Sequence, residues 1–203
     1  MPDVILWIIS FVIAYLLGSI SFGIIVSHIG HGPDLRTVGS KSTGASNVQR
    51  TMGWKYGLIT FFGDALKAVL ACWIGTLLCG NLYCTLICGL CVIVGHNWPV
   101  FFGFKGGKGV ASSCGVMLFC YPVPALACFI LTIILIAVFR YISLGSMFMV
   151  ALYALLVSVF FSGGNPWIIA WSVVMAAIVI YRHHANIGRL LHGTENKLGN
   201  RVK

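Results

Sequence analysis

Three short stretches of this chain combine glycines with cationic side chains, a composition that suits a backbone site for an anion. The second of them, Lys105-Gly106-Gly107-Lys108-Gly109, runs into a predicted helix. Backbone N–H groups, the positive end of a helix and two ammonium groups together suit a phosphate. The stretch is not a nucleotide P-loop, because Lys108 is followed by glycine rather than serine or threonine. It therefore predicts a site for a phosphorylated small molecule.

The first stretch, residues 39–50, is rich in small hydroxyl residues and glycine. Its backbone N–H groups could converge on an anion, while Lys41 and Arg50 supply positive charge. Asn47 could cap a short helix that leads to Arg50. A solvated serine and glycine loop explains the same composition, and the stretch by itself leaves both interpretations open.

The third stretch, residues 181–197, follows the last apolar segment. If the helix of that segment continues, Arg182, Asn186 and Arg189 share one face, and His183 lies one turn from Asn186. Taken alone, the stretch is better explained as a basic segment beside the membrane that attracts anionic lipid.

The composition indicates what kind of fold must position these stretches. Of 203 residues, 59% are hydrophobic and only 8% are charged, and the mean hydropathy is +0.98. Soluble domains carry about 25% charged residues, so the composition excludes a soluble globular protein. Lipid must face much of the apolar surface, and the sequence therefore predicts an all-α, polytopic membrane protein. We expect a single domain, residues 1–203.

Each crossing of a bilayer needs roughly 20 apolar residues. Apolar runs separated by glycine, proline or charge predict seven transmembrane helices: Val4–Val26, Gly57–Leu78, Leu82–Val100, Gly109–Cys120, Val123–Phe139, Leu144–Phe161 and Pro166–Tyr181. The fourth of these is short for a full crossing.

The cations determine the expected orientation. Twelve of the 13 lysine and arginine residues lie in the first, third and fifth connections or in the tail, which includes Arg201 and Lys203. The other three connections contain none. By the positive-inside rule, the N-terminus is expected outside and the C-terminus in the cytoplasm. All three stretches then lie on the cytoplasmic face, where we expect them to converge on one anionic, phosphorylated ligand.

The thirteenth cation, Lys67, lies within the second helix, three residues after Asp64. Such a pair can neutralise itself at reduced cost in a membrane, and we interpret it as a structural ion pair, with a relay or gate as the alternative. Eight cysteines lie in or beside apolar helices, and no metal site is expected from their spacing. Cys79 and Cys84 flank an outer turn, and the sequence leaves their pairing open.

At these residues the chain resembles the bacterial acyl-phosphate:glycerol-3-phosphate 1-acyltransferase family, over nearly its whole length. Two specific motifs carry the resemblance: Gly95-His96 and Pro99 followed by residues 105–111, and Arg182-His183-x-x-Asn186-Ile187 followed by Leu191-x-Gly193-x-Glu195. The first stretch retains Ser40, Gly44, Ala45, Asn47 and Arg50. It departs at Lys41-Ser42, where the family often has Gly-Asn, and at Ser46, where the family has threonine.

The resemblance implies transfer of a fatty acyl group from acyl phosphate to the sn-1 hydroxyl of glycerol 3-phosphate, the first acylation of phospholipid synthesis. The products are lysophosphatidic acid and phosphate. The His-x4-Asp dyad of other glycerolipid acyltransferases is absent, since none of the six histidines has an aspartate five positions later. The resemblance implies no cofactor and no metal.

The resemblance also assigns roles to particular positions. It implies catalytic roles for Ser40, Lys108, His183 and Asn186. It implies substrate contacts for Arg50, Thr43, Asn47, Gly106, Gly107, Gly109, Ser143 and Ser146. The proton of the attacking hydroxyl is expected to go to a substrate phosphate, with His183 as the alternative base.

The expected partners are the two small-molecule substrates, membrane lipid and the enzyme that supplies acyl phosphate, with no nucleic acid. The expected location is the bacterial inner membrane. An organic-phosphate or anion transporter and a non-catalytic lipid-binding scaffold are the alternatives. Carriers usually place polar sites near the bilayer midplane on repeated, broken helices, whereas here the cations cluster at one surface and no repeat is visible.

Overall fold

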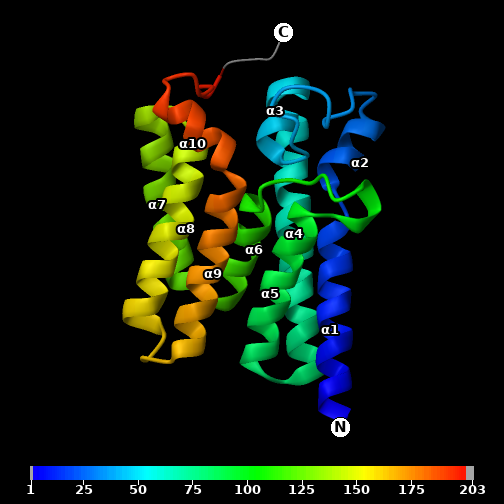
Figure 1. Cartoon of the computed structure of the whole chain (residues 1–203), viewed down its shortest axis with the longest axis vertical. Helices are drawn as coiled ribbons and strands as arrows, with labels where there is room; N and C mark the ends of the chain where they lie inside the picture. The colour runs from blue at the N-terminus through cyan, green and yellow to red at the C-terminus, as the bar shows by residue number, and fades with distance from the viewer. Residues whose placement is uncertain (1, 200–203) are drawn as a thin grey trace. The chain divides into compact units, whose positions relative to one another are not determined.

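The computed structural model describes residues 2–199, so the tail cations Arg201 and Lys203 lie outside the described residues. Every regular element in this range is helical, as expected from the composition (Figure 1). The chain divides into two compact units, one up to Cys120 and one from Tyr121 onward, and each is described by itself. The expectation of a single domain stays a prediction.

The first unit is built on three long helices that lie side by side. α1 packs against α4 and α5, and α4 also packs against α3 and α6 (Figure 1). The elements are α1 (Pro2–Ser19), α2 (Phe22–Ile29), α3 (Ala45–Met52), α4 (Trp54–Cys79), α5 (Leu82–Asn97), the 3-10 turn η1 (Val100–Phe102) and α6 (Val110–Cys120).

Glycines let the helices of this unit approach closely. A Cβ on Gly95 of α5 would collide with the carbonyl of Tyr15 in α1, and one on Gly18 would collide with the carbonyl of Val92. Small residues at such positions let helix backbones pack tightly where lipid provides no hydrophobic drive for helix association. This close packing holds α1 against α5.

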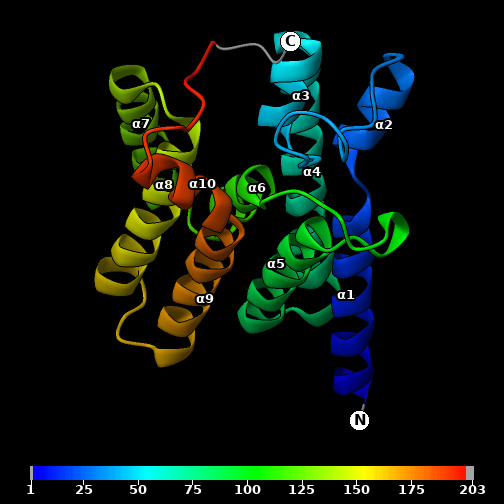
Figure 2. The same ribbon diagram turned by 45° about the horizontal axis from the view of Figure 1, so that its top comes forward.

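The first predicted helix, Val4–Val26, is interrupted. It forms α1 and α2, separated by a short link at Ile20 and Ser21 (Figure 2). The ammonium of Lys67 donates hydrogen bonds to the carbonyls of Gly18 and Ile20, at 2.9 and 2.5 Å. These carbonyls are left without helical partners at the break, and a cation is a favourable partner at a helix C-terminus.

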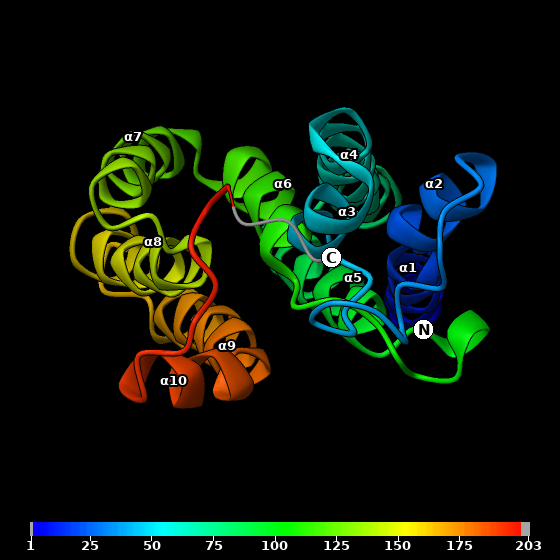
Figure 3. The ribbon, with the colours of Figure 1, turned by 90° about the horizontal axis from the view of Figure 1, so that it is seen from above.

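The second unit is a row of three helices, with α8 between α7 and α9 (Figure 3). α7 and α9 both begin with a proline, whose missing N–H costs nothing in the first helical turn. The elements are α7 (Pro122–Phe139), α8 (Ile142–Leu156), the π-helical turn η2 (Val157–Phe161), α9 (Pro166–Arg182) and α10 (His184–Leu191).

A helix occupies each of the segments predicted to cross the membrane, but not all are long enough to cross alone. Within the described residues, five helical segments have the length and hydropathy of a span, and the number is six if the bent pair of α9 and α10 counts as one span. α6 has only 11 residues. The chain is a multi-pass membrane protein, and the count of seven spans stays a prediction.

Candidate active site

Asn47 organises the first cationic stretch. Its side-chain oxygen accepts a hydrogen bond from the backbone N–H of Ser40 at 2.9 Å. Its side-chain nitrogen lies within 3.2 Å of three carbonyl oxygens, those of Leu35, Val38 and Ser42. The side chain is 1% exposed, and it therefore fixes the shape of this loop from inside.

The expected N-cap role of Asn47 is wrong. Asn47 lies within α3, and the residue at the N-cap is Gly44. The cap fails because the Asn47 amide is used by the loop that precedes the helix, through contacts up to 12 residues away. The substrate contact expected of Asn47 stays a prediction.

Two further residues of this stretch are polar and buried. Arg50 on α3 is 7% exposed, and Thr43 is 1% exposed. The Thr43 hydroxyl has no hydrogen-bond partner among the described residues. Val48 packs with Leu35 and Val26 beneath the stretch and supports it. An unpartnered buried hydroxyl costs free energy, so Thr43 suits a place where a ligand or water completes the bond.

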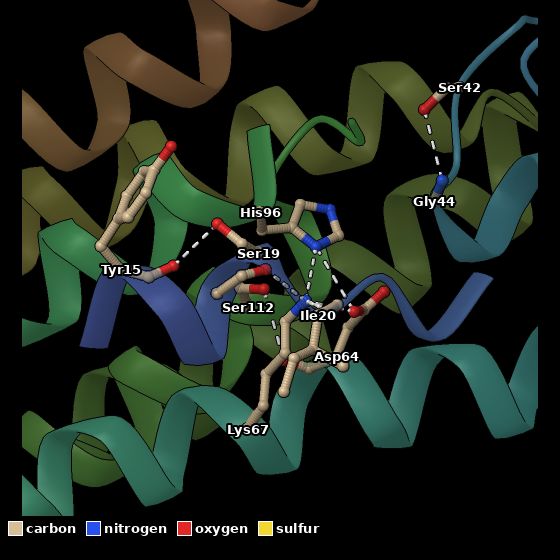
Figure 4. Close-up of polar contacts among 10 residues, drawn as sticks. Tyr15, Ser19, Ile20, Ser42, Gly44, Asp64, Lys67, His96 and Ser112 are labelled. Carbon is tan, nitrogen blue, oxygen red and sulfur yellow. Dashed lines mark hydrogen bonds and ion pairs between the residues drawn. The ribbon is translucent and has the colours of Figure 1, made fainter. Parts of the chain in front are cut away.

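A buried network of Asp64, Lys67 and His96 lies between α4 and α5 (Figure 4). Lys67 Nζ is 2.7 Å from Asp64 Oδ1 and 3.2 Å from His96 Nδ1. His96 Nδ1 is 3.4 Å from the same Asp64 oxygen. All three side chains are at most 4% exposed. The predicted ion pair of Asp64 and Lys67 is therefore confirmed, and His96 contacts both of its members.

The second cationic stretch lies on His96. The backbone N–H of Gly107 donates to the carbonyl of His96 at 3.1 Å. A Cβ on Gly107 would collide with His96 Nε2, and one on Gly106 would collide with the His96 carbonyl. The two glycines are thus required by close approach. Lys108 follows them as a half-buried side chain, and α6 begins at Val110 as predicted within about a residue.

Asn97 was not expected to belong to the site. It is fully buried, and neither its side-chain nitrogen nor its oxygen has a hydrogen-bond partner among the described residues. A Cβ on Gly109 would lie 3.0 Å from Asn97 Oδ1, so the amide faces the start of α6. Leaving a buried amide unpaired is costly, and this position therefore suits a bound polar group. The sequence feature that could have indicated Asn97 is a polar residue beside His96 at the end of an apolar run.

In the second unit, the last membrane helix does not continue straight. α9 ends at Arg182 and α10 begins at His184, with a bend of 61° between them. The condition of a continuous helix is therefore not met, and Arg182 lies on α9. Asn186 and Arg189 both lie on α10, where both contact Glu195. His183 sits at the bend and is 2% exposed.

A backbone carbonyl at the bend fixes the tautomer of neutral His183. Its Nδ1 lies 2.7 Å from the carbonyl oxygen of Val179. A carbonyl can only accept, so Nδ1 carries the hydrogen, and in a neutral imidazole Nε2 is then the acceptor. This tautomer suits either a base at Nε2 or, when protonated, a phosphate ligand.

Glu195 joins the second-unit residues of the candidate site. Its carboxylate accepts hydrogen bonds from Ser143 at 2.8 Å, Asn186 at 2.7 Å and Arg189 at 2.7 Å. Burial would raise the pKa of Glu195, but these hydrogen bonds and the charge of Arg189 outweigh burial and hold the pKa below its ordinary value. The motif contained Glu195, yet no site role was assigned to it. Its signal was a lone acid in a basic stretch.

Three further predicted residues, Ser143, Ser146 and Asn186, lie in the second unit. Ser143 is held by Glu195, whereas the Ser146 hydroxyl donates to the Ile142 carbonyl of its own helix at 2.9 Å. Asn186 is 2% exposed, and its Oδ1 has no hydrogen-bond partner among the described residues. Each unit thus holds its own group of predicted residues. That the two groups meet at one ligand stays a prediction.

Known proteins resemble this chain over almost its whole length. The family model described as glycerol-3-phosphate acyltransferase matches residues 8–193. A glycerol-3-phosphate acyltransferase of Clostridioides difficile is 42% identical over 95% of this chain and 96% of that protein. One from Geobacillus kaustophilus is 44% identical over 92% of this chain and 93% of that protein.

Two solved structures are also similar. They are crystal structures of PlsY (YgiH), an integral membrane glycerol 3-phosphate acyltransferase, in a glycerol 3-phosphate form and a lysophosphatidic acid form. The first has a TM-score of 0.88 and 39% identity over 95% of this chain and 96% of that one. The second has a TM-score of 0.85 and 38% identity over 96% of each chain.

The apolar helices, several of them long enough to cross a bilayer, define a multi-pass integral membrane protein. The comparisons make the class specific. The chain belongs to the glycerol-3-phosphate acyltransferase family, as its motifs predicted.

Proposed function

We propose that this protein transfers a fatty acyl group from acyl phosphate to the sn-1 hydroxyl of glycerol 3-phosphate. The products are 1-acyl-glycerol 3-phosphate and inorganic phosphate. The observation that carries the proposal is the Gly106–Gly107 loop, which the hydrogen bond and close approach to His96 fix beside Lys108, because a rigid glycine backbone and a cation then lie at one place. The names of the relatives and the glycerol 3-phosphate form of PlsY support glycerol 3-phosphate as the acceptor.

The chemistry needs no covalent enzyme intermediate. Acyl phosphate is a mixed anhydride, so its carbonyl is already activated and phosphate is a good leaving group. The sn-1 oxygen attacks the carbonyl carbon, the new ester C–O bond forms, and the bond from carbon to the phosphate oxygen breaks. The proton of the hydroxyl goes to a substrate phosphate, in preference to Nε2 of His183.

The main task of the protein is to hold two phosphate dianions, which repel each other unless cations offset their charge. Arg50 and Lys108 would supply that charge, with Ser40, His183 and Asn186 as further phosphate ligands. The backbone of residues 106–109 would bind the donor phosphate and the developing oxyanion. The unpartnered Asn186 Oδ1 and Thr43 hydroxyl supply hydrogen-bonding capacity that substrate would use.

Glu195 would support this reaction without contacting substrate. Its contact with the Asn186 nitrogen turns the Asn186 oxygen away from the carboxylate, and its contact with Ser143 uses the hydroxyl proton of that residue. Ser143 and Ser146 both donate their hydroxyl protons within the protein, so any contact they make with acyl phosphate would be secondary.

We further propose seven spans in the bacterial inner membrane, with the N-terminus outside and the reaction on the cytoplasmic face. The distribution of the cations supports this orientation. A cytoplasmic reaction would place the enzyme where a partner that makes acyl phosphate can supply it.

The proposal is tested with purified protein in detergent, labelled glycerol 3-phosphate, and either acyl phosphate or acyl-CoA as donor. Labelled lysophosphatidic acid is expected when acyl phosphate is the donor, and not when acyl-CoA is the donor. Lys108→Ala should abolish it, whereas Lys55→Ala, which removes an exposed lysine at the start of α4, should not. Transfer from acyl-CoA would overturn the donor assignment. Glycerol 3-phosphate uptake into proteoliposomes without any acylation would indicate a carrier instead.

A further inference from the structure

Two thiols of the first unit have no role in the proposed reaction. Cys79 is the last residue of α4, and Cys84 lies in the first turn of α5. Their sulfur atoms are 2.7 Å apart, compared with about 2.05 Å in a formed disulfide. We propose that Cys79 and Cys84 form a disulfide in the protein as it stands in the membrane, which ties the outer ends of α4 and α5.

The packing of the α4–α5 hairpin brings the two thiols together. One turn further into the hairpin, the hydroxyl oxygens of Thr76 and Thr85 are 2.8 Å apart. Beyond them, Gly75 faces Cys88, since a Cβ on Gly75 would lie 2.8 Å from the Cys88 sulfur. Three successive contacts in one register show that the approach of Cys79 and Cys84 follows from the helix packing.

The connecting turn is equally well defined. Gly80 ends α4 in the left-handed region at a φ of +58°, and its N–H donates to the Thr76 carbonyl at 2.8 Å. Asn81 caps α5 by accepting a hydrogen bond from the Tyr83 N–H at 2.8 Å. Both helix ends next to the cysteines are thus fixed without any covalent link.

The two thiols differ in exposure, which sets the order of reaction. Cys84 is fully buried, whereas Cys79 is partly exposed and has the Ser10 hydroxyl 3.5 Å from its sulfur. An oxidant therefore reaches Cys79 first, and Cys84 resolves the intermediate from within the hairpin.

The oxidant is a dithiol/disulfide protein on the outer face. The Cys79 thiolate attacks one sulfur of its disulfide, which forms a mixed disulfide and releases the other sulfur as a thiolate. Cys84 then attacks the Cys79 sulfur and expels the oxidant's first sulfur. Cys79 and Cys84 lose two electrons in total, the oxidant's disulfide is reduced to two thiols, and the two protons end on those thiols.

The location of the pair rests on the proposed orientation. In the first unit, the cations of residues 36–55 and 105–108 lie at or near the start of α4 and after the end of α5. The cysteines lie at the opposite ends of both helices. Cys79 is 25 residues after the start of α4, or about 37 Å along the axis of that helix. The cation-free end faces outward, where disulfides persist.

The pair is tested by mass spectrometry on the wild-type protein in its own membranes. Cells are quenched in acid, free thiols are blocked with N-ethylmaleimide, and the protein is digested with trypsin. The peptide of residues 68–105 contains five cysteines and no internal lysine or arginine. Three adducts are expected without prior reduction and five after it, with the two missing adducts at Cys79 and Cys84.

Two variants act as controls. Cys84→Ser should carry four adducts whether or not it is reduced first, because Cys79 then has no partner. Cys91→Ser, which removes a thiol elsewhere on α5, should still gain two adducts on reduction. Five adducts in unreduced wild-type protein, or a reducible pair at other positions, would overturn the proposal. This readout counts thiols only, so it is independent of the acyltransferase assay.

Discussion

Glu195 shows how one carboxylate can order several polar side chains. Its oxygens accept from Ser143, Asn186 and Arg189, and these side chains come from α8 and α10. Hydrogen bonds to a charged group are stronger than neutral ones. The carboxylate therefore holds the C-terminal segment and fixes which way the Asn186 amide points.

We expect Glu195→Gln to lower the stability of the protein by roughly 1–3 kcal/mol at pH 7, because the charged acceptor is lost. The pKa of Glu195 is lowered in the folded protein, so its stabilisation is complete above the ordinary pKa of 4.5 and is lost as the pH falls through the folded value. Thermal unfolding in detergent at several pH values checks this. The gap between wild type and variant should begin to narrow below about pH 4.5 and close once the pH is below the folded pKa of Glu195, and a constant gap would contradict the role of the charge. Asp3→Asn, at an exposed carboxylate, should change little.

His183 allows a test of the proton acceptor. His183→Gln should raise the KM for glycerol 3-phosphate, while kcat falls less than about a hundredfold, because a substrate phosphate takes the proton. A general base typically contributes 10²–10⁴-fold, so a fall of kcat in that range would assign the base to His183 instead. Steady-state kinetics measure both constants. His184→Gln changes the exposed neighbouring histidine and should leave both near wild type.

The glycine loop between α5 and α6 depends on the side chain beneath it. We expect Gly107→Ala to reduce kcat/KM at least tenfold in a folded protein, because the new Cβ would collide with His96 and displace the loop. Gly188→Ala on α10 adds the same methyl group in open space and should be tolerated. Size-exclusion chromatography of both variants reports folding, and an active Gly107→Ala protein would show that the loop can shift without loss.

The Asp64–Lys67 pair should matter for stability in proportion to its burial. Asp64→Asn leaves the Lys67 ammonium buried without its counter-ion, and we expect a loss of roughly 3–5 kcal/mol. Replacing both residues by Asp64→Asn and Lys67→Met should recover part of that loss. Asp34→Asn removes an exposed partner of Arg36 and should change the stability little, because water and salt screen an exposed pair. Unfolding in detergent compares the variants, and equal effects at the two sites would refute the distinction.

The helices were largely predictable because lipid requires long apolar helical segments. Each predicted segment contains a helix in the structure. The break at Ile20 and Ser21 was not predictable, because its partner Lys67 lies 47 residues away. Glu195 was similarly hidden, since its contact with Ser143 spans 52 residues. The glycine loop was recognised from local composition, whereas its support by His96 required the packing of α5 against the loop. Local pattern thus predicted the elements, and long-range polar contacts determined how they end and bend.

The chain as a whole carries a formal net charge of +9, unevenly distributed along it. We expect an N-terminal epitope tag to be accessible to protease in spheroplasts, in which the inner membrane is exposed but still sealed. A fluorescent protein that matures only in the cytoplasm should fluoresce when fused to the C-terminus. Ends on opposite sides require an odd number of spans. A protected N-terminal tag with a fluorescent C-terminus would indicate an even number and would contradict the proposed topology.

The burial of the network beneath the glycine loop has a consequence for how the loop responds to salt. Asp64, Lys67 and His96 are at most 4% exposed, and a Cβ on Gly107 would collide with the His96 side chain. Such surroundings polarise far less than bulk water, so Coulomb attraction among the three groups is stronger and dissolved salt screens it less. The loop should therefore keep its support at ionic strengths that would loosen an ion pair on an open surface.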